Sequence, residues 1–103
     1  MGAEEFWHKE VGVTPEEAFH KAVESAAYEH GHGGYTGTIA EKSDFVMIEV
    51  PKIYTAMDYI DKLMGEEDPR VANKWGPAGC VCLGPSKKDP KMKVYMFFGI
   101  ASS

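Results

Sequence analysis

The last apolar stretch of the chain, KVYMFFGIA at residues 93–101, decides what kind of fold the sequence can form. Successive side chains of a β-strand point to opposite faces of a sheet, and both faces of this strand are apolar. One face carries Val94, Met96, Phe98 and Ile100, and the other carries Tyr95, Phe97 and Ala101. The second face needs cover, which can come from sheet neighbours, a loop or another subunit. We favour another subunit, which predicts a homodimer.

The chain begins with the signals of a strand and a helix. Residues 6–13 mix aromatic and β-branched residues with polar ones, which favours a partly exposed strand near a sheet edge. Thr14 can cap a helix that starts at Pro15, and Glu17 can complete a capping box. The apolar stripe of this helix consists of Phe19, Ala22, Val23 and Ala26. Its spacing predicts a helix as far as about Glu29.

The middle of the chain predicts two strands and a second helix. Residues 38–42 and 44–50 have strand-like composition, and the connection between them is short enough for a hairpin. Residues 44–50 are almost continuously apolar, which places that strand inside the sheet. Apolar residues then recur at helical spacing over residues 53–64, and a short strand follows at 80–83.

These elements give the order β-α-β-β-α-β-β in one small domain, residues 1–103. The chain has 44% apolar residues, enough for a single core. Adjacent strands have short connections, and the helices follow single strands. This pattern predicts an α+β fold, with a mixed or antiparallel sheet and two helices packed on one face.

Composition limits the function classes. Sixteen acidic residues outnumber eleven basic ones, and a formal net charge of −5 does not favour binding to nucleic acid. The longest apolar run, residues 94–101, is far shorter than a membrane span, and the acidic N-terminus does not resemble a signal peptide. We therefore expect a cytoplasmic protein that does not bind membranes. Cys80 and Cys82 lie one residue apart in a strand, where a disulfide would be strained, so we expect reduced thiols.

A glycine- and histidine-rich loop, EHGHGGYTGT at residues 29–38, is the candidate binding segment. The glycines follow a helix instead of preceding one, so the helix end beside them carries partial negative charge and favours a cation or a protonated imidazole. This order argues against a P-loop or a dinucleotide fingerprint. A simpler interpretation is that Gly31 caps the C-terminal end of the helix and that His30 interacts with the helix dipole. That interpretation leaves the other loop glycines without a reason.

The candidate ligand-binding residues combine imidazole, hydroxyl and bare backbone groups. They are His30, His32, Gly33, Gly34, Tyr35, Thr36 and Thr38, with Trp75 as a flat apolar wall. An ordinary rim residue of the core is the preferred interpretation of Trp75. A zinc-like site of His30 and His32 with Glu29, Cys80 or Cys82 is an alternative. Its spacing lacks the C-x-x-C of structural zinc sites, so we expect neither a metal nor another cofactor.

Three functional hypotheses follow. The first is a non-enzymatic binding domain that uses residues 30–38 for a small polar or nucleotide-like ligand. The second is a protein-interaction module or inhibitor that acts on a host or partner protein. The third is a small enzyme with a loop histidine as acid or base, although no recognised nucleophile pattern is present and no catalytic residue can be assigned. A basic cluster at Lys87, Lys88, Lys91 and Lys93 is either a solvated loop or a docking point for an acidic partner.

Three segments together resemble a group of other sequences. They are GHGGYTGTIAEK at residues 31–42, KWGPAG at residues 74–79 and FFGIASS at residues 97–103. This combination resembles short hypothetical proteins of phage and bacterial genomes. The resemblance covers about a third of the chain and implies a small cytoplasmic accessory protein that binds a host factor or a small metabolite. It assigns no activity and no catalytic residue.

Overall fold

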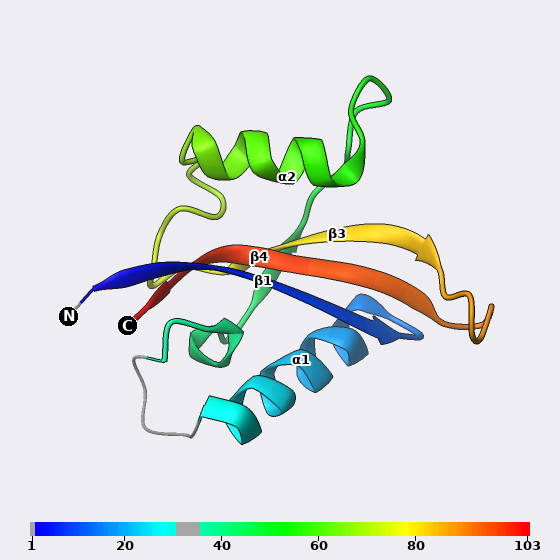
Figure 1. The fold of residues 1–103 in the computed structure, drawn as a ribbon, viewed down its shortest axis with the longest axis horizontal. Coiled ribbons are helices and arrows are strands. Elements are labelled where there is room, and N and C mark those ends of the chain that lie inside the picture. Colours follow the sequence, from blue (N-terminus) through cyan, green and yellow to red (C-terminus); the bar gives the residue numbers. More distant parts are fainter. Residues whose placement is uncertain (1, 31–35) are drawn as a thin grey trace.

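A four-stranded sheet lies between two helices in the computed structural model, which describes residues 2–30 and 36–103 (Figure 1). The strands are β1 (Ala3–Gly12), β2 (Phe45–Met47), β3 (Ala78–Pro85) and β4 (Lys93–Ser102). The helices are α1 (Pro15–His30), α2 (Ala56–Gly65) and a short 3-10 helix, η1 (Ile39–Glu41). Neither α1 nor α2 has the length and hydrophobicity that a membrane-spanning helix needs.

Strand β4 is one of the two inner strands of the sheet, whose order is β1-β4-β3-β2. It pairs antiparallel with β1 along its whole length and antiparallel with β3, whereas β2 pairs parallel with β3. The predicted α+β class and mixed sheet are therefore confirmed. The predicted edge position of the first strand is also confirmed, because β1 pairs with β4 alone. The parallel pair arises because the chain crosses through α2 between β2 and β3.

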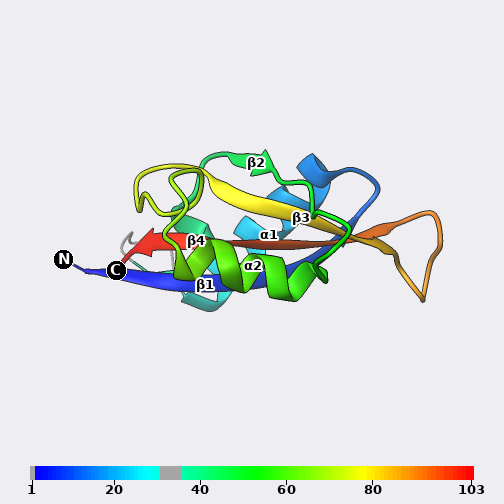
Figure 2. The ribbon, with the colours of Figure 1, turned by 90° about the horizontal axis from the view of Figure 1, so that it is seen from above.

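The two helices cover opposite faces of the sheet, which corrects the expectation that both pack on one face (Figures 1 and 2). On one face, α1 packs with Tyr95 and Phe97 of β4 in a buried cluster, the α1-side core. On the other face, α2 packs with Met96 and Phe98 in the α2-side core. The alternation of β4 is the physical reason, since each apolar face takes its own helix. Each face of β4 has a helix of the same chain packed on it, so β4 no longer argues for a second subunit.

A 3-10 helix stands where the sequence predicts a strand at residues 38–42. The Thr38 hydroxyl accepts a hydrogen bond from the Ala40 amide at 3.2 Å, and the Lys42 amide donates to the Ile39 carbonyl at 2.9 Å. Local bonds of this kind compete with strand pairing. The following strand, β2, is only three residues long and lies at the sheet edge, not inside it as residues 44–50 predicted.

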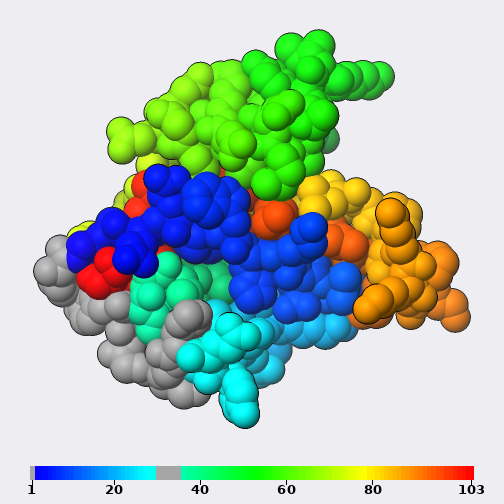
Figure 3. Space-filling model, in the orientation of Figure 1, coloured from blue at the N-terminus to red at the C-terminus, as the bar shows by residue number. Residues whose placement is uncertain are grey.

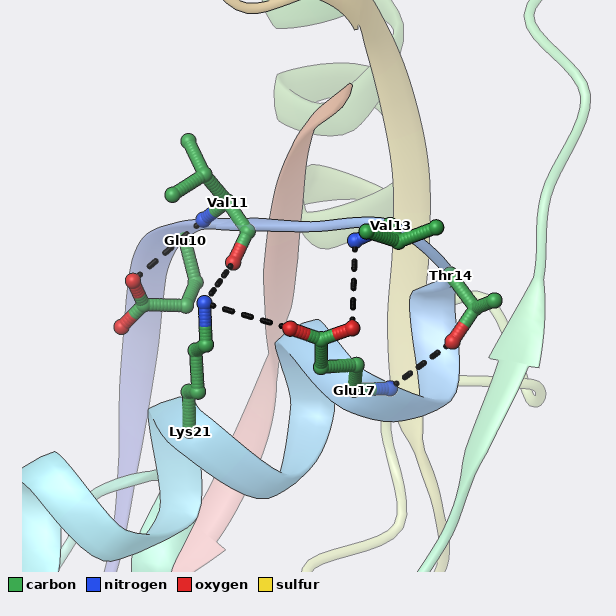
Figure 4. Close-up of polar contacts among 6 residues, drawn as sticks. All are labelled: Glu10, Val11, Val13, Thr14, Glu17 and Lys21. Carbon is green, nitrogen blue, oxygen red and sulfur yellow. Dashed lines mark hydrogen bonds and ion pairs between the residues drawn. The ribbon is translucent and has the colours of Figure 1, made fainter. Parts of the chain in front are cut away.

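The first turn of α1 is tied to the end of β1, as Figure 4 shows. The Thr14 hydroxyl accepts from the Glu17 amide at 3.1 Å, which confirms the predicted N-cap. The Glu17 carboxylate accepts from the Val13 amide at 3.4 Å, one residue before the position that a capping box uses. Lys21 lies 3.4 Å from that carboxylate and donates to the Val11 carbonyl at 3.2 Å. These contacts set the angle at which α1 turns back under the sheet.

Candidate functional site

The described part of the glycine-rich loop begins again at Thr36. His32, Gly33, Gly34 and Tyr35 lie outside the described residues, and His30 is the last residue of α1. Thr36 and Thr38 are half-buried beside η1. The structure therefore places two of the predicted hydroxyl groups near the C-terminal end of α1.

The two threonine hydroxyls are engaged with each other and with a carboxylate. Thr36 Oγ1 lies 2.8 Å from Thr38 Oγ1 and donates to Glu41 Oε2 at 2.8 Å. The Thr36 amide donates to the same oxygen at 3.1 Å. This network, which the sequence did not predict, holds the turn that leads into η1. The hydroxyls thus have a structural role whether or not a ligand binds.

Gly37 shows why one loop glycine is needed. Its φ of +71° lies in the left-handed region, and its amide donates to the Ser102 carbonyl at 2.8 Å. A Cβ atom at this position would lie 2.5 Å from the Glu4 carboxylate. The left-handed backbone therefore favours glycine at position 37, and a side chain there would also displace the Glu4 carboxylate.

An open cleft of about 380 Å³ lies between β1, the end of α1 and η1. Its lining consists of Glu5, Phe6, Trp7, His8, Ala26, Glu29, Gly37, Thr38 and Ile39. Phe6, Ala26 and Ile39 belong to the α1-side core and form the apolar part. Among the described candidates from the sequence, Thr38 is the one that lines this cleft.

The described lining of the cleft is acidic. Glu5 and Glu29 contribute carboxylates, and the C-terminal end of α1 contributes partial negative charge. Among the described residues, no lysine or arginine lines the cleft. His8 lies 3.5 Å from the Glu10 carboxylate and is partly exposed. His8 and Glu5 were not predicted as site residues, although their positions in β1, next to the aromatic pair, were a usable signal.

Trp75, the predicted apolar wall, lies on the protein surface. Trp75 is 64% exposed, and its amide donates to the Asn73 side chain at 2.9 Å. It is not among the described residues that line the cleft.

Lys42, only 4% exposed, donates to the carbonyls of Asn73, Lys74 and Gly76 at 3.2, 3.3 and 2.9 Å. Burial lowers the pKa of Lys42 from its ordinary value, whereas the three carbonyls favour its charged form. This lysine fixes the loop at residues 73–76, and no signal in the sequence predicted that role.

The two cysteines are free thiols in different surroundings. Cys80 is buried in the α1-side core, and burial raises its pKa to about 12, with smaller contributions from Cys82 and Glu16. Cys82 is exposed near the end of β3. In the part of the chain that the structure describes, no three His, Cys, Asp or Glu side chains come together as a metal site.

A thiol-reactive probe is expected to label Cys82 rapidly in the native protein and Cys80 only after unfolding. The thiolate is the reactive form, so a raised pKa and complete burial both protect Cys80. Mass spectrometry after iodoacetamide treatment measures this as one modified thiol in native buffer and two in urea. The Cys82→Ser variant should show no rapid labelling. Rapid modification of both cysteines in native buffer would contradict the burial of Cys80.

Comparison of the chain with family models, curated proteins and solved structures gives no significant match.

Proposed function

We propose that the chain is a non-enzymatic binding domain that takes a small polar ligand where the loop of residues 30–38 meets the cleft between β1 and α1. The observation that carries this proposal is the cleft of about 380 Å³ beside Gly37 and Thr38. Small-molecule sites typically have volumes of roughly 300–1,000 Å³ and combine apolar walls with a few polar groups. The α1-side core supplies the apolar wall, and Thr38, His8 and Glu29 supply polar groups.

The charge of the lining favours a ligand with an amine or a guanidinium group. Glu5 and Glu29 would repel a phosphate, and the C-terminal end of α1 adds to that repulsion. A cation instead gains from both carboxylates and from the helix dipole. Of the small polar ligands that the sequence allows, cationic ones therefore fit this cleft better than nucleotides.

A thermal-shift screen of small amines, guanidines and nucleotides tests the proposal. We expect at least one cationic compound to raise the melting temperature by about 6–10 °C at ten times its Kd, since that occupancy stabilises the folded state by about 1.4 kcal/mol. Glu5→Gln and Glu29→Gln should each weaken binding about tenfold by removing one carboxylate. Asp61→Asn, on the exposed surface of α2, is the matched control and should leave binding unchanged.

The loop is tested by a second pair of variants. His32→Ala and Tyr35→Ala, within residues 30–38, should each abolish the shift. No shift across a broad library would contradict the proposal. A shift that survives all four changes would place the ligand elsewhere and would also count against it.

A further inference from the structure

We propose a second binding site, at the opposite end of the sheet, for an anionic amphiphile with a carboxylate head and an acyl-type apolar body. The site is an open groove of about 740 Å³ between β1, the ends of β3 and β4, and the hairpin loop at residues 86–92. Figure 3 shows this hairpin, in orange, beside the end of β1, in blue. The groove shares no described lining residue with the cleft at α1, so this proposal is independent of the proposed function.

The floor of the groove is the part of the α2-side sheet face that lies beyond the α2-side core. Val11 pairs with Val94, which lies two residues before Met96 of that core and on the same face. Leu83 packs against the core from β3. All three floor residues, Val11, Leu83 and Val94, remain partly exposed.

A β-bulge helps to shape this floor. Cys82 pairs with Tyr95, but Gly84 pairs with Val94, so Leu83 is an extra residue in β3. Gly84 has a φ of +111°, a value that side chains rarely tolerate. The bulge bends β3 where the hairpin begins and leaves Leu83 facing the groove.

The rim of the groove is basic. Lys9, Lys87 and Lys88 line it and are exposed, and none of them has an ion-pair partner among residues 2–30 and 36–103. Both carboxylates in the lining contact groups that are one or two residues away in sequence. Glu10 contacts His8 and accepts from the Val11 amide, and Asp89 accepts from the Lys91 amide.

Elsewhere in the molecule, basic side chains more often have acidic partners. The described ion pairs of lysine and arginine are Lys21–Glu17, Lys62–Glu66 and Arg70–Asp68. In a chain with a net charge of −5, the groove lining has three lysines against two carboxylates, Glu10 and Asp89, and so carries a local excess of positive charge. That charge is complementary to a carboxylate.

Charge alone does not make this site, because exposed ion pairs contribute little affinity. The apolar floor supplies the other part of the affinity through the CH₂ groups that it buries. A small molecule is favoured over an acidic peptide, since the groove has the volume of a small-molecule site and stable protein interfaces bury roughly 1,200–2,000 Å².

Titration of the full-length chain with sodium octanoate, followed by amide NMR shifts, tests the proposal. We expect the amides of Val11, Leu83 and Val94 to shift, with millimolar or tighter affinity. Acetate, which lacks the apolar body, and octylammonium, which reverses the charge, should each bind at least about tenfold more weakly.

Variants separate the two parts of the site. The double variant Lys87→Gln, Lys88→Gln should weaken octanoate binding about tenfold, and Leu83→Ser should do the same through the floor. Lys52→Gln is the matched control, because Lys52 is an exposed lysine outside the groove. Its binding should equal that of the unaltered chain.

Several results would overturn the proposal. They are the absence of octanoate binding, equal binding of octylammonium, and shifts confined to the cleft at α1. Tighter binding of a glutamate-rich peptide than of octanoate would also overturn it and would assign the groove to an acidic protein partner. Simultaneous binding of octanoate and an amine ligand, each unaffected by the other's variants, would support two separate sites.

Discussion

Replacing Lys42 by methionine is expected to lower the free energy of unfolding by about 2–4 kcal/mol, because three backbone carbonyls lose a charged donor. The ammonium group contacts the carbonyls of Asn73, Lys74 and Gly76 at 3.2, 3.3 and 2.9 Å. Methionine keeps an unbranched apolar side chain, so the loss measures the hydrogen bonds more than the packing.

The position of Lys42 extends this loss of stability beyond its own loop. The residue follows η1 and precedes β2, and the loop that it holds leads into β3. Its side chain therefore secures the approach of the two chain segments that form the parallel pair. We also expect faster amide exchange in β2, where only three residues pair with β3.

Urea denaturation followed by circular dichroism measures the change. Lys52→Met is the matched control, since Lys52 is exposed, and it should alter stability by no more than about 0.5 kcal/mol. A Lys42→Met protein as stable as the unaltered chain would show that water replaces the ammonium at these carbonyls without cost.

Replacing Phe97 by alanine is expected to cost about 3–5 kcal/mol, a large share of the roughly 5–15 kcal/mol that stabilises an ordinary domain. Phe97 is completely buried, and its ring lies 5.5 Å from that of Phe19 and 5.8 Å from that of Phe45. It therefore joins α1, β2 and β4 within the α1-side core. The substitution leaves a cavity where these three elements meet.

Phe98→Ala is the matched comparison, because Phe98 is also completely buried but belongs to the α2-side core. Both variants should lose similar stability in urea. Hydrogen exchange should then separate them, with faster exchange in α1 for Phe97→Ala and in α2 for Phe98→Ala. The same exchange pattern in both variants would contradict the division of the core by the sheet.

The start of α1 could be predicted because its signal is local, and Thr14 caps it as expected. The second helix, expected over residues 53–64, begins only at Ala56, where the Thr55 hydroxyl accepts from the Asp58 amide at 3.2 Å. The candidate site was harder to predict. Thr36 and Thr38 were selected as ligand groups, but their hydroxyls also hold the turn before η1. The acidic character of the cleft comes from Glu5 of β1 and Glu29 at the end of α1. Glu5 is far from the loop threonines in sequence, and both carboxylates come to line the same cleft as Thr38 only when the chain folds.

Lys42 shows that the local sequence pattern does not predict burial by residues that are distant in the chain. A lysine beside Ser43 and Asp44 is typical of an exposed turn, and only the return of residues 73–76 converts it into a buried donor. Trp75 shows the same limit, because its flat ring is compatible with either a pocket wall or the solvent-exposed loop that the structure contains.

The sequence by itself determined that β4 is apolar on both faces, where α1 begins, and that the fold is α+β. Only the tertiary structure decided that the helices take opposite faces, that β2 is an edge strand and that η1 replaces a predicted strand. The physical reason is that alternation and capping act between residues close in sequence. Which element covers a face depends on contacts between residues far apart in the chain, and these exist only after folding.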